Sequence, residues 1–376
     1  MKATHRHAGE LMKVLQVINS LSTGGAERLL LDTIPLFNER GTQMDLLLLD
    51  GTPHPFLDAL RALRCCKVHV VGTSARLRNP MFAFRIAPFL KQYDVVHVHL
   101  FPALYLVAMA RVVSRSRAKL IFTEHSTSNR RMRQAWLGAL QTVMYNRYDR
   151  VVCITREVCD VLKRHTGMGD EKFVVIENGV TLAKILDAVP LPRAELFPDT
   201  NAKILIQVAS FQEPKDQPTV IRALARLPQH VKLLFVGDGP LRANAEALVQ
   251  QLRLQDRVKF LGVRMDVPRM LKSSDVVVLS SKHEGLSLSS IEGMASGRPF
   301  VASDAPGLTD MVSGAGILFP TQDDAALAAV IERLLTDPTQ YADVVKAGLE
   351  RARQFDIQTM VTRHIELYQA LANGAA

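Results

Sequence analysis

The chain has 376 residues, of which 48% are apolar and 22% are charged, and its net charge is +9. This length exceeds one ordinary hydrophobic core and fits two domains of about 180 residues each. No apolar run reaches the ~18 residues that a membrane-spanning helix needs, and the polar start, Met1–Glu10, predicts no signal peptide. The composition therefore favours a two-domain globular protein over a membrane-spanning one.

The positive charge belongs to the first half of the chain alone. Residues 1–185 hold 26 Lys and Arg against 15 Asp and Glu, a net +11, whereas the remaining residues hold 20 against 22, a net −2. Such asymmetry indicates an anionic partner for the first half: a membrane surface, a lipid phosphate or nucleic acid. The alternative is an excess of arginine that only aids solubility.

Strand-like apolar runs alternate with amphipathic stretches through both halves. This alternation is typical of parallel sheets with crossover helices. A proline-containing segment without a strand, Leu182–Thr200, is predicted to be the linker. The predicted domains are residues 1–185 and 186–354, followed by a final helix at about 355–372. The predicted strands are Val14–Asn19, Met44–Leu49, Lys67–Val71, Asp94–His99, Lys119–Thr123, Arg150–Ile154, Phe173–Ile176, Lys203–Ala209, Val231–Val236, Val258–Leu261, Asp275–Leu279 and Pro299–Ala302.

Glycines and histidines follow several predicted strands of the first half. Gly24 and Gly25 come after the first strand, where glycine lets a backbone approach a ligand closely. His125 follows the fifth strand, and His97 and His99, which end the fourth, are weaker candidates. Strand ends of this architecture face the ligand, although each feature alone also fits a purely structural role.

The most informative element is a pair of carboxylates, Glu284 and Glu292, which follow a predicted buried strand. Glu284 is expected in the loop after that strand, and Glu292 one to two turns into the next helix. The helix would open at about Ser287–Ser289, where backbone N–H groups without partners can hold an anion. Carboxylates that accept bonds from sugar hydroxyls, beside N–H groups that hold phosphate, suit a nucleotide-sugar.

These motifs, in this order, resemble the retaining glycosyltransferases of family 4, in the group 1 glycosyl transferases. The resemblance covers nearly the whole chain after residue 10 and rests on the Glu-x7-Glu element and the linked glycine-rich loops. It implies the α/β GT-B fold: two facing Rossmann-like, doubly wound domains with a cleft between them. The first would be the acceptor side and the second the donor side, with the C-terminal helix crossing back onto the first.

The resemblance also implies roles for residues at matching positions. His125, Lys215 and Glu284 would be catalytic, Lys215 by neutralising the diphosphate and Glu284 by binding sugar hydroxyls, while Glu292 would bind the ribose. Ser210 stands where the family commonly has arginine, and this leaves the number of phosphate contacts open. The donor-binding set is Gly24, Gly25, Ser210, Lys215, Gly237, Gly262, Val263, Arg264, Glu284, Gly285, Leu286, Ser287, Leu288 and Glu292.

The implied reaction is retaining transfer of a sugar from a nucleotide-diphosphate sugar, with UDP favoured, to a glycan or lipid-linked acceptor. Synthesis of a cell-surface polysaccharide or a glycolipid is the implied setting. No cofactor and no metal are expected, because the chain has no Asp-x-Asp motif and its four cysteines lack zinc spacing. Two alternatives stay open: a non-catalytic nucleotide-sugar or glycan-binding partner of the same fold, and a nucleotide-sugar epimerase. Nucleic-acid binding is least favoured, because no recognisable module is present.

A basic cluster in the first half suggests where a lipid-linked acceptor would be met. Arg130, Arg131 and Arg133 begin a predicted helix that carries the only tryptophan, Trp136. Cations at a helix N-terminus are mildly unfavourable, so a membrane-surface element is one interpretation, and a solvated basic end of a core-facing helix is the other. The expected location is the cytoplasm, with peripheral binding at the inner face of the membrane.

Overall fold

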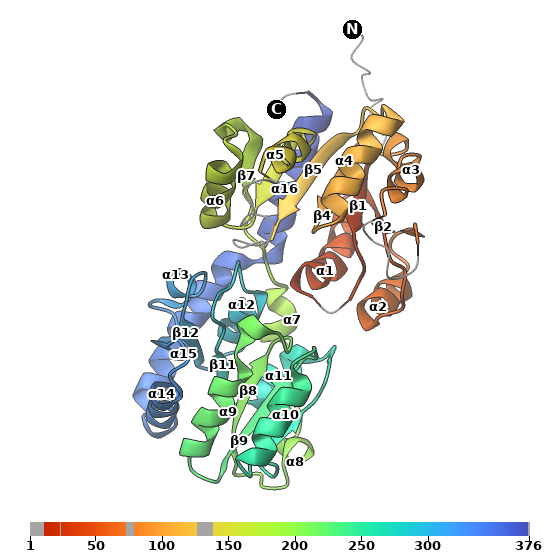
Figure 1. Cartoon of the computed structure of the whole chain (residues 1–376). Helices are drawn as coiled ribbons and strands as arrows, with labels where there is room; N and C mark the ends of the chain where they lie inside the picture. The colour runs from red at the N-terminus through yellow and green to blue at the C-terminus, as the bar shows by residue number, and fades with distance from the viewer. Residues whose placement is uncertain (1–10, 23, 73–78, 126–137, 375–376) are drawn as a thin grey trace. The chain divides into compact units, whose positions relative to one another are not determined.

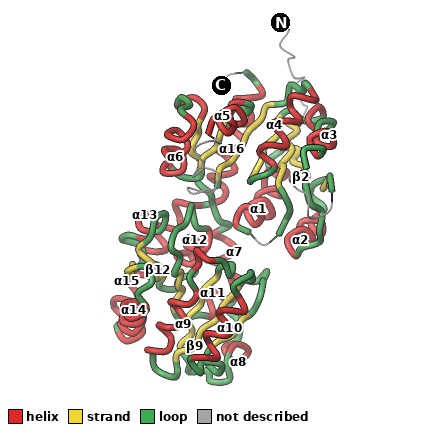
Figure 2. The backbone as a smooth tube through the Cα atoms, viewed as in Figure 1, coloured by secondary structure: helices red, strands yellow, loops and turns green. Residues whose placement is uncertain are grey.

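A computed structural model of the chain describes residues 11–22, 24–72, 79–125 and 138–374. These residues form two compact units, one of which runs to Glu177 and takes up the chain again from Gln358. The other comprises Asn178–Ile357. In each unit, helices lie on both faces of a parallel sheet (Figure 1; Figure 2), which confirms the predicted pair of Rossmann-like folds.

The first unit contains a seven-stranded sheet in the order β3-β2-β1-β4-β5-β6-β7. Every pairing is parallel. Its central strands are buried on both faces, as in β4, where Val95, Val96 and Val98 are fully shielded from solvent, whereas the edge strand β3 is partly exposed. The strands are β1 (Met12–Ile18), β2 (Thr42–Leu48), β3 (Val68–Val70), β4 (Val95–His99), β5 (Lys119–Glu124), β6 (Arg150–Cys153) and β7 (Phe173–Val175).

The helices of the first unit come from both ends of the chain. The C-terminal helix α16 packs within this unit, with Met360, Val361 and Tyr368 buried, as the resemblance implied. The helices are α1 (Gly25–Glu39), α2 (Pro55–Leu63), α3 (Phe82–Ile86), α4 (Ala103–Ser114), α5 (Gly138–Asn146), α6 (Arg156–Thr166) and α16 (Ile357–Ala372), with 3-10 turns η1 (Phe89–Lys91) and η3 (Asp170–Lys172).

The second unit contains a six-stranded parallel sheet in the order β10-β9-β8-β11-β12-β13. Alternate residues of a strand enter different core clusters: Ile204 and Ile206 of β8 pack on one face, whereas Leu205 packs on the other. The strands are β8 (Lys203–Val208), β9 (Val231–Val236), β10 (Val258–Phe260), β11 (Val276–Leu279), β12 (Phe300–Asp304) and β13 (Ile317–Pro320). All twelve predicted strands are present, and β13 is an edge strand that the sequence did not predict.

Helices cover both faces of the second sheet, some between its strands and others before β8 or after β13 (Figure 1). They are α7 (Leu182–Leu186), α8 (Arg193–Leu196), α9 (Gln217–Arg226), α10 (Arg242–Gln251), α11 (Val267–Ser273), α12 (Leu288–Ala295), α13 (Thr309–Val312), α14 (Asp324–Thr336) and α15 (Pro338–Ala352), with 3-10 turns η4 (Glu213–Lys215) and η5 (Arg353–Phe355).

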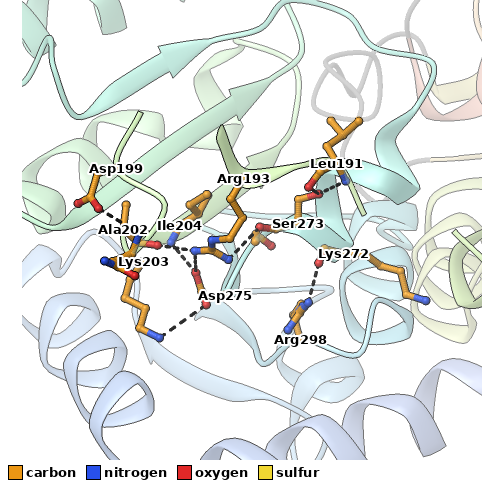
Figure 3. A network of polar contacts seen from close by, with 12 residues as sticks. Leu191, Arg193, Asp199, Ala202, Lys203, Ile204, Lys272, Ser273, Asp275 and Arg298 are labelled. Carbon is orange, nitrogen blue, oxygen red and sulfur yellow. Dashed lines mark hydrogen bonds and ion pairs between the residues drawn. The ribbon is translucent and has the colours of Figure 1, made fainter. Parts of the chain in front are cut away.

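The segment that we expected to be a linker, Leu182–Thr200, is fixed in the second unit by a polar network (Figure 3). Arg193 donates a hydrogen bond to Oδ2 of Asp275 at 2.7 Å, and it also donates to the carbonyl oxygen of Ala202. The same carboxylate oxygen accepts from the backbone N–H of Ile204, the second residue of β8, at 2.7 Å. The segment is therefore a packed part of the second unit rather than a free connection.

Candidate active site

Several of the predicted site residues lie where the strand order of a sheet reverses. Strand order changes direction between β1 and β4 in the first unit, and between β8 and β11 in the second. Open parallel sheets bind ligands beyond the carboxyl ends of their strands at such points. Lys215 follows β8 and Glu284 follows β11, while Gly24 follows β1. In each unit, these candidate residues therefore lie beyond the carboxyl ends of the strands.

In the second unit, Lys215 and Glu284 form a close ion pair. Nζ of Lys215 lies 2.5 Å from Oε1 of Glu284, and the two side chains are 23% and 10% exposed. Oγ of Ser281 donates a second hydrogen bond to the same oxygen at 2.6 Å. The pair unites a cation for phosphate with a carboxylate for sugar hydroxyls, and in this state each neutralises the other.

Two buried polar side chains, Gln207 and Ser280, form hydrogen bonds with the backbone that carries Lys215. Nε2 of Gln207, on β8, donates to the carbonyl oxygen of Lys215 at 3.1 Å and to Oγ of Ser280 at 3.2 Å. That hydroxyl donates in turn to the carbonyl oxygens of Lys215 and Asp216, at 3.0 and 2.8 Å. Asp216 has a backbone φ of 44°, a left-handed conformation that residues other than glycine rarely adopt. These bonds stabilise the turn that presents Lys215.

Glu284 is held by the loop that follows β12. Its backbone N–H donates to the carbonyl oxygen of Pro306 at 2.9 Å. The next residue, Gly307, has a φ of 79°, and a Cβ there would lie 2.1 Å from the carbonyl oxygen of Glu284. Only glycine permits this approach, so Gly307 is a determinant of the Glu284 conformation.

Helix α12 begins directly after the carboxylate loop. Ser287 is its N-cap, and its Oγ accepts a hydrogen bond from the N–H of Ser290 at 3.3 Å. The first N–H groups of a helix have no intrahelical partner, so those of Leu288 and Ser289 remain as donors for an anion. Leu286 and Leu288 are partly buried against the core, Gly285 is also partly buried, and Glu292 lies in the helix.

The loops after β9 and β10 interlock with the loop after β8. Gly237 has a φ of 131°, and a Cβ there would lie 2.1 Å from the carbonyl oxygen of Ala209. Its N–H donates to the carbonyl oxygen of Gly262 at 2.8 Å. Val263 and Arg264 follow and are partly exposed. The resemblance implied donor binding at Gly237, Gly262, Val263 and Arg264, and the loops here are built of closely approaching main chain.

Ser210 does not supply the charge of the arginine that the family commonly has. Its carbonyl oxygen accepts a hydrogen bond from Nε2 of Gln217 at 3.0 Å, which fixes the loop after β8. The nearby Arg264 is held by both carboxylate oxygens of Asp266, at 2.8 and 2.7 Å. This ion pair lowers the pKa of Asp266 and raises that of Arg264, because each charge stabilises the other. Arg264 is therefore already neutralised by a carboxylate.

In the first unit, two adjacent glycines open α1 and differ in their surroundings. A Cβ on Gly24 would lie 2.2 Å from Oε2 of Glu27, whereas a Cβ on Gly25 would meet nothing within 4 Å. Glu27 accepts a hydrogen bond from Oγ of Ser22 at 3.3 Å, and burial raises its pKa. A side chain at position 24 would thus displace the carboxylate of Glu27, whereas Gly25 leaves open space beside the backbone.

His125, directly after β5, lies beside a buried histidine. Its Nε2 lies 3.0 Å from Nδ1 of His99. His97 and His99, the weaker sequence candidates, lie at the carboxyl end of β4 and are only 1% and 4% exposed. Glu124 is buried and accepts from the hydroxyl of Tyr145 at 2.9 Å. Of the four residues, His125 alone is partly exposed.

The predicted acceptor-side cluster, Arg130, Arg131, Arg133 and Trp136, lies outside the described residues. Among the residues that are described, no group of three or more His, Cys, Asp or Glu is arranged to hold a metal ion. Within the same residues, no helix is both long enough and apolar enough to cross a membrane.

Sequence reasoning missed the residues that position the candidate side chains. Gln16, Gln207 and Tyr368 lie outside the motifs, and the side-chain hydrogen bonds that they form reach residues distant in the sequence; Gly307 lies in the segment 306–312, to which the sequence analysis assigned no such role. The available signal was a glutamine inside each apolar run that begins a sheet: Gln16 and Gln207 are both 1% exposed. A polar residue buried in a central strand requires a partner, and this requirement marks the point where the loops converge.

Comparison with protein families identifies both halves of the chain. The model described as glycosyl transferases group 1 matches residues 191–351, and the model described as glycosyltransferase family 4 matches residues 23–184. Each match falls on one of the two sheets. Together they span the motifs on which the resemblance was based.

Individual relatives carry the same description. The chain is 29% identical over 227 residues to the lipopolysaccharide core biosynthesis glycosyltransferase LpsD of Rhizobium meliloti, and this match covers 60% of the chain but less than two thirds, 64%, of LpsD. It is 24% identical over 367 residues to an N-acetylgalactosaminyltransferase of Campylobacter jejuni that acts on a diphospho-undecaprenol-linked sugar, covering 90% of the chain and 94% of that enzyme.

Solved structures confirm the fold. Anabaena Alr3699/HepE in complex with UDP and glucose superimposes with a TM-score of 0.83 at 22% identity, over 96% of this chain and all of that one. WaaG, a glycosyltransferase involved in lipopolysaccharide biosynthesis, gives a TM-score of 0.73 at 16% identity, over 94% of this chain and 99% of WaaG. The fold is therefore GT-B.

Proposed function

This chain belongs to the group 1 glycosyltransferases, and on that premise we propose that it transfers a sugar from a UDP-sugar to a glycan or lipid-linked acceptor, with retention of anomeric configuration. The observation that carries the proposal is the Lys215–Glu284 pair beside the N-terminus of α12. UDP is favoured because HepE, which shares the fold, was solved with UDP and glucose. Synthesis of a polysaccharide or lipopolysaccharide is favoured by the names of LpsD and the Campylobacter enzyme.

The proposed chemistry relies on stabilising negative charge. As the bond from the anomeric carbon to the diphosphate breaks, charge develops on the leaving phosphate oxygens. The ammonium of Lys215 and the N–H groups of Leu288 and Ser289 would stabilise that charge, and Glu284 would orient the sugar through its hydroxyls. Glu292 is proposed to bind the ribose. Gly25, which has no side chain, is proposed to let a ligand approach its backbone closely.

The test is turnover of a panel of UDP-sugars by the purified chain, with acceptor glycans and lipid-linked sugars. Proton NMR of the first product reports the anomeric configuration. An α-linked product from an α-linked donor supports retaining transfer, whereas a β-linked product refutes retention. Donor binding without transfer or hydrolysis would favour the non-catalytic alternative, and conversion of the donor to its epimer without any acceptor would favour the epimerase.

We also propose that the reaction needs no divalent metal. Lys215 is a fixed cation on the phosphate side, and the positive end of α12 adds to it. Activity is therefore expected to survive EDTA. Loss of activity that magnesium or manganese restores would refute this part of the proposal without affecting the assignment of the donor.

A membrane surface is the proposed location of a lipid-linked acceptor. Helices α3 and α4 lie side by side in the first unit (Figure 1). They carry exposed apolar side chains, with Phe84 and Val112 each 57% and Val113 46% exposed. Residues 79–119 contain six Lys and Arg and a single acidic residue, Asp94. Exposed apolar groups within a basic region suit the inner, anionic leaflet of a membrane.

Co-sedimentation with vesicles of anionic lipid tests this location. Each basic residue near such a surface contributes about 1 kcal/mol, so binding should be strong at low salt and weak at high salt. The double variant Val112→Ser/Val113→Ser should reduce binding. Val189→Ser, at a residue of the second unit that is 70% exposed, should leave it unchanged. Equal binding of both variants would refute a role of α4, and Arg130→Gln/Arg131→Gln would then test the predicted cluster.

A further inference from the structure

A chain of hydrogen bonds inside the first unit connects the C-terminal helix to His125. The hydroxyl of Tyr368, on α16, lies 2.7 Å from Nδ1 of His97 and accepts from Nε2 of Gln16 at 3.3 Å. Oε1 of Gln16 lies 2.7 Å from Nε2 of His99, whose Nδ1 lies 3.0 Å from Nε2 of His125. Three separate segments, β1, β4 and α16, thus meet behind one histidine.

The four histidines of this cluster are neutral at physiological pH. Burial lowers the pKa of His97 and His99 well below the usual value, with repulsion from neighbouring rings as the second cause. Burial likewise lowers the pKa of His125 and of His364, each to about 4. A neutral imidazole has one N–H donor and one acceptor nitrogen, so each hydrogen bond in the chain has a definite direction.

The amide of Gln16 sets that direction. Its oxygen can only accept, so His99 donates from Nε2 and its Nδ1 carries the lone pair. Nδ1 of His99 therefore accepts from Nε2–H of His125, and Nδ1 of His125 is left as an acceptor. At the other end, the Gln16 amino group donates to Tyr368. Turning this amide by 180° would reverse every bond, so one side chain decides the tautomer of His125.

We propose that Gln16 is a positioning residue that holds His125 in its Nε2–H tautomer, so that His125 offers its ligand a hydrogen-bond acceptor. Tyr368 supports this role, because its hydroxyl accepts from the Gln16 amino group and donates to His97, which in turn lies 2.6 Å from Oγ1 of Thr123. The C-terminal helix thereby contributes to the site although Tyr368 itself is fully buried.

The tautomer restricts what His125 can bind. An acceptor nitrogen pairs with a hydroxyl and repels a phosphate oxygen, which has no proton to donate. Given the proposed function, on which this step rests, His125 receives a hydrogen bond from a sugar hydroxyl rather than donating one to the diphosphate. The tautomer itself is a property of the folded chain and does not depend on that function.

The test is 15N NMR of the imidazoles in the full chain at neutral pH, with UDP-sugar kinetics alongside. In the wild type, Nε2 of His125 should carry the proton. Gln16→Leu removes the acceptor of His99, and the His125 signals should move to those of a mixture of tautomers. Loss of a partner that orients a metal-bound histidine costs about 10- to 100-fold in activity; by analogy, kcat should fall by about 10-fold or more while the affinity for UDP is unchanged.

A matched control lies in the same unit. Nε2 of His165 is 2.9 Å from Oε1 of the buried Gln141, outside the chain that reaches His125. Gln141→Leu should alter the His165 signals and leave those of His125 and the kcat unchanged. Where Gln16→Leu does not fold, Tyr368→Phe provides the milder variant, with a smaller shift in the same direction.

Two results would overturn the proposal: an Nδ1–H tautomer of His125 in the wild type, or His125 signals that do not respond to either Gln16→Leu or Tyr368→Phe. A correct tautomer in a chain without transferase activity would refute the proposed function and leave the role of Gln16 standing.

Discussion

Replacing Glu284 by Gln separates the two roles proposed for its carboxylate. The substitution keeps the size of the side chain and one oxygen for Ser281 but removes the charge that holds Lys215 at 2.5 Å. Without that charge, the ammonium of Lys215 no longer has to leave a carboxylate in order to bind phosphate. We therefore expect Glu284→Gln to bind UDP more tightly than the wild type does.

The size of the effect follows from the geometry. Both side chains are largely shielded, at 23% and 10% exposure, but not fully buried, so we expect a gain of about 1 kcal/mol for UDP, or roughly fivefold. A sugar hydroxyl loses a charged acceptor, which costs about 1.5–3 kcal/mol. The dissociation constant of a UDP-sugar, divided by that of UDP, should therefore rise by roughly 10- to 150-fold.

Isothermal titration calorimetry at fixed ionic strength, with UDP and with the UDP-sugar, measures this ratio. The matched control is Glu213→Gln, because Glu213 pairs with Lys282 at 2.6 Å on the same two loops but is 68% exposed. Its removal should change both affinities by less than about 1 kcal/mol. If Glu284→Gln weakens UDP and the UDP-sugar equally, the carboxylate neither restrains Lys215 nor contacts the sugar, and the reasoning fails.

Three further changes test the packing and electrostatics of the site. Because the folded chain keeps His97, His99 and His364 neutral by burial, which lowers each pKa below the unfolded value, unfolding takes up protons below pH 6.5. The free energy of unfolding should thus fall with decreasing pH by up to about 1.4 kcal/mol per histidine and pH unit, and urea titrations from pH 7 to 5 that show no decline would contradict this. Gly307→Ala should lower both stability and donor affinity, because its Cβ would meet a carbonyl oxygen at 2.1 Å; an unchanged melting temperature would show that the loop adapts. Glu292→Ala should weaken nucleotide-sugar binding by about 1–3 kcal/mol, and unchanged affinity would exclude the proposed ribose contact.

Local sequence patterns were sufficient to predict twelve strands but did not predict the edge strand β13. Buried strands such as Val276–Leu279 are continuous apolar runs and were predicted. Strand β13, Ile317–Pro320, has only four residues, ends in proline and follows Gly314 and Gly316. Only Phe319 in it is buried. A short, half-exposed edge strand owes its conformation to pairing with β12, which no local pattern reports.

Gly293 illustrates a residue whose reason lies entirely in tertiary packing. Within helix α12, glycine costs about 1 kcal/mol against alanine, and the sequence offered no compensation. In the fold, a Cβ at this position would lie 2.6 Å from the ring of Phe300 and 3.1 Å from Val277. Overpacking of this kind costs about 1–3 kcal/mol, so the close approach of the helix to β11 and β12 outweighs the loss of propensity.

A buried glutamine lies at the switch point of both sheets. Gln16 is the fifth residue of β1 and Gln207 the fifth of β8, and each reaches across to the next strand: Gln16 to His99, which ends β4, and Gln207 to Ser280, which follows β11. A buried amide costs free energy unless it is paired, so neither position is explained by core packing alone. In the first unit the amide of Gln16 orients His99, which contacts His125. In the second unit the amide of Gln207 fixes the backbone of Lys215.

The two amides differ in one respect. Oε1 of Gln207 has no hydrogen-bond partner within the described residues, whereas both the oxygen and the nitrogen of the Gln16 amide form hydrogen bonds. A buried acceptor without a partner costs free energy, so the Gln207 amide, unlike that of Gln16, is not fully satisfied by the described residues alone.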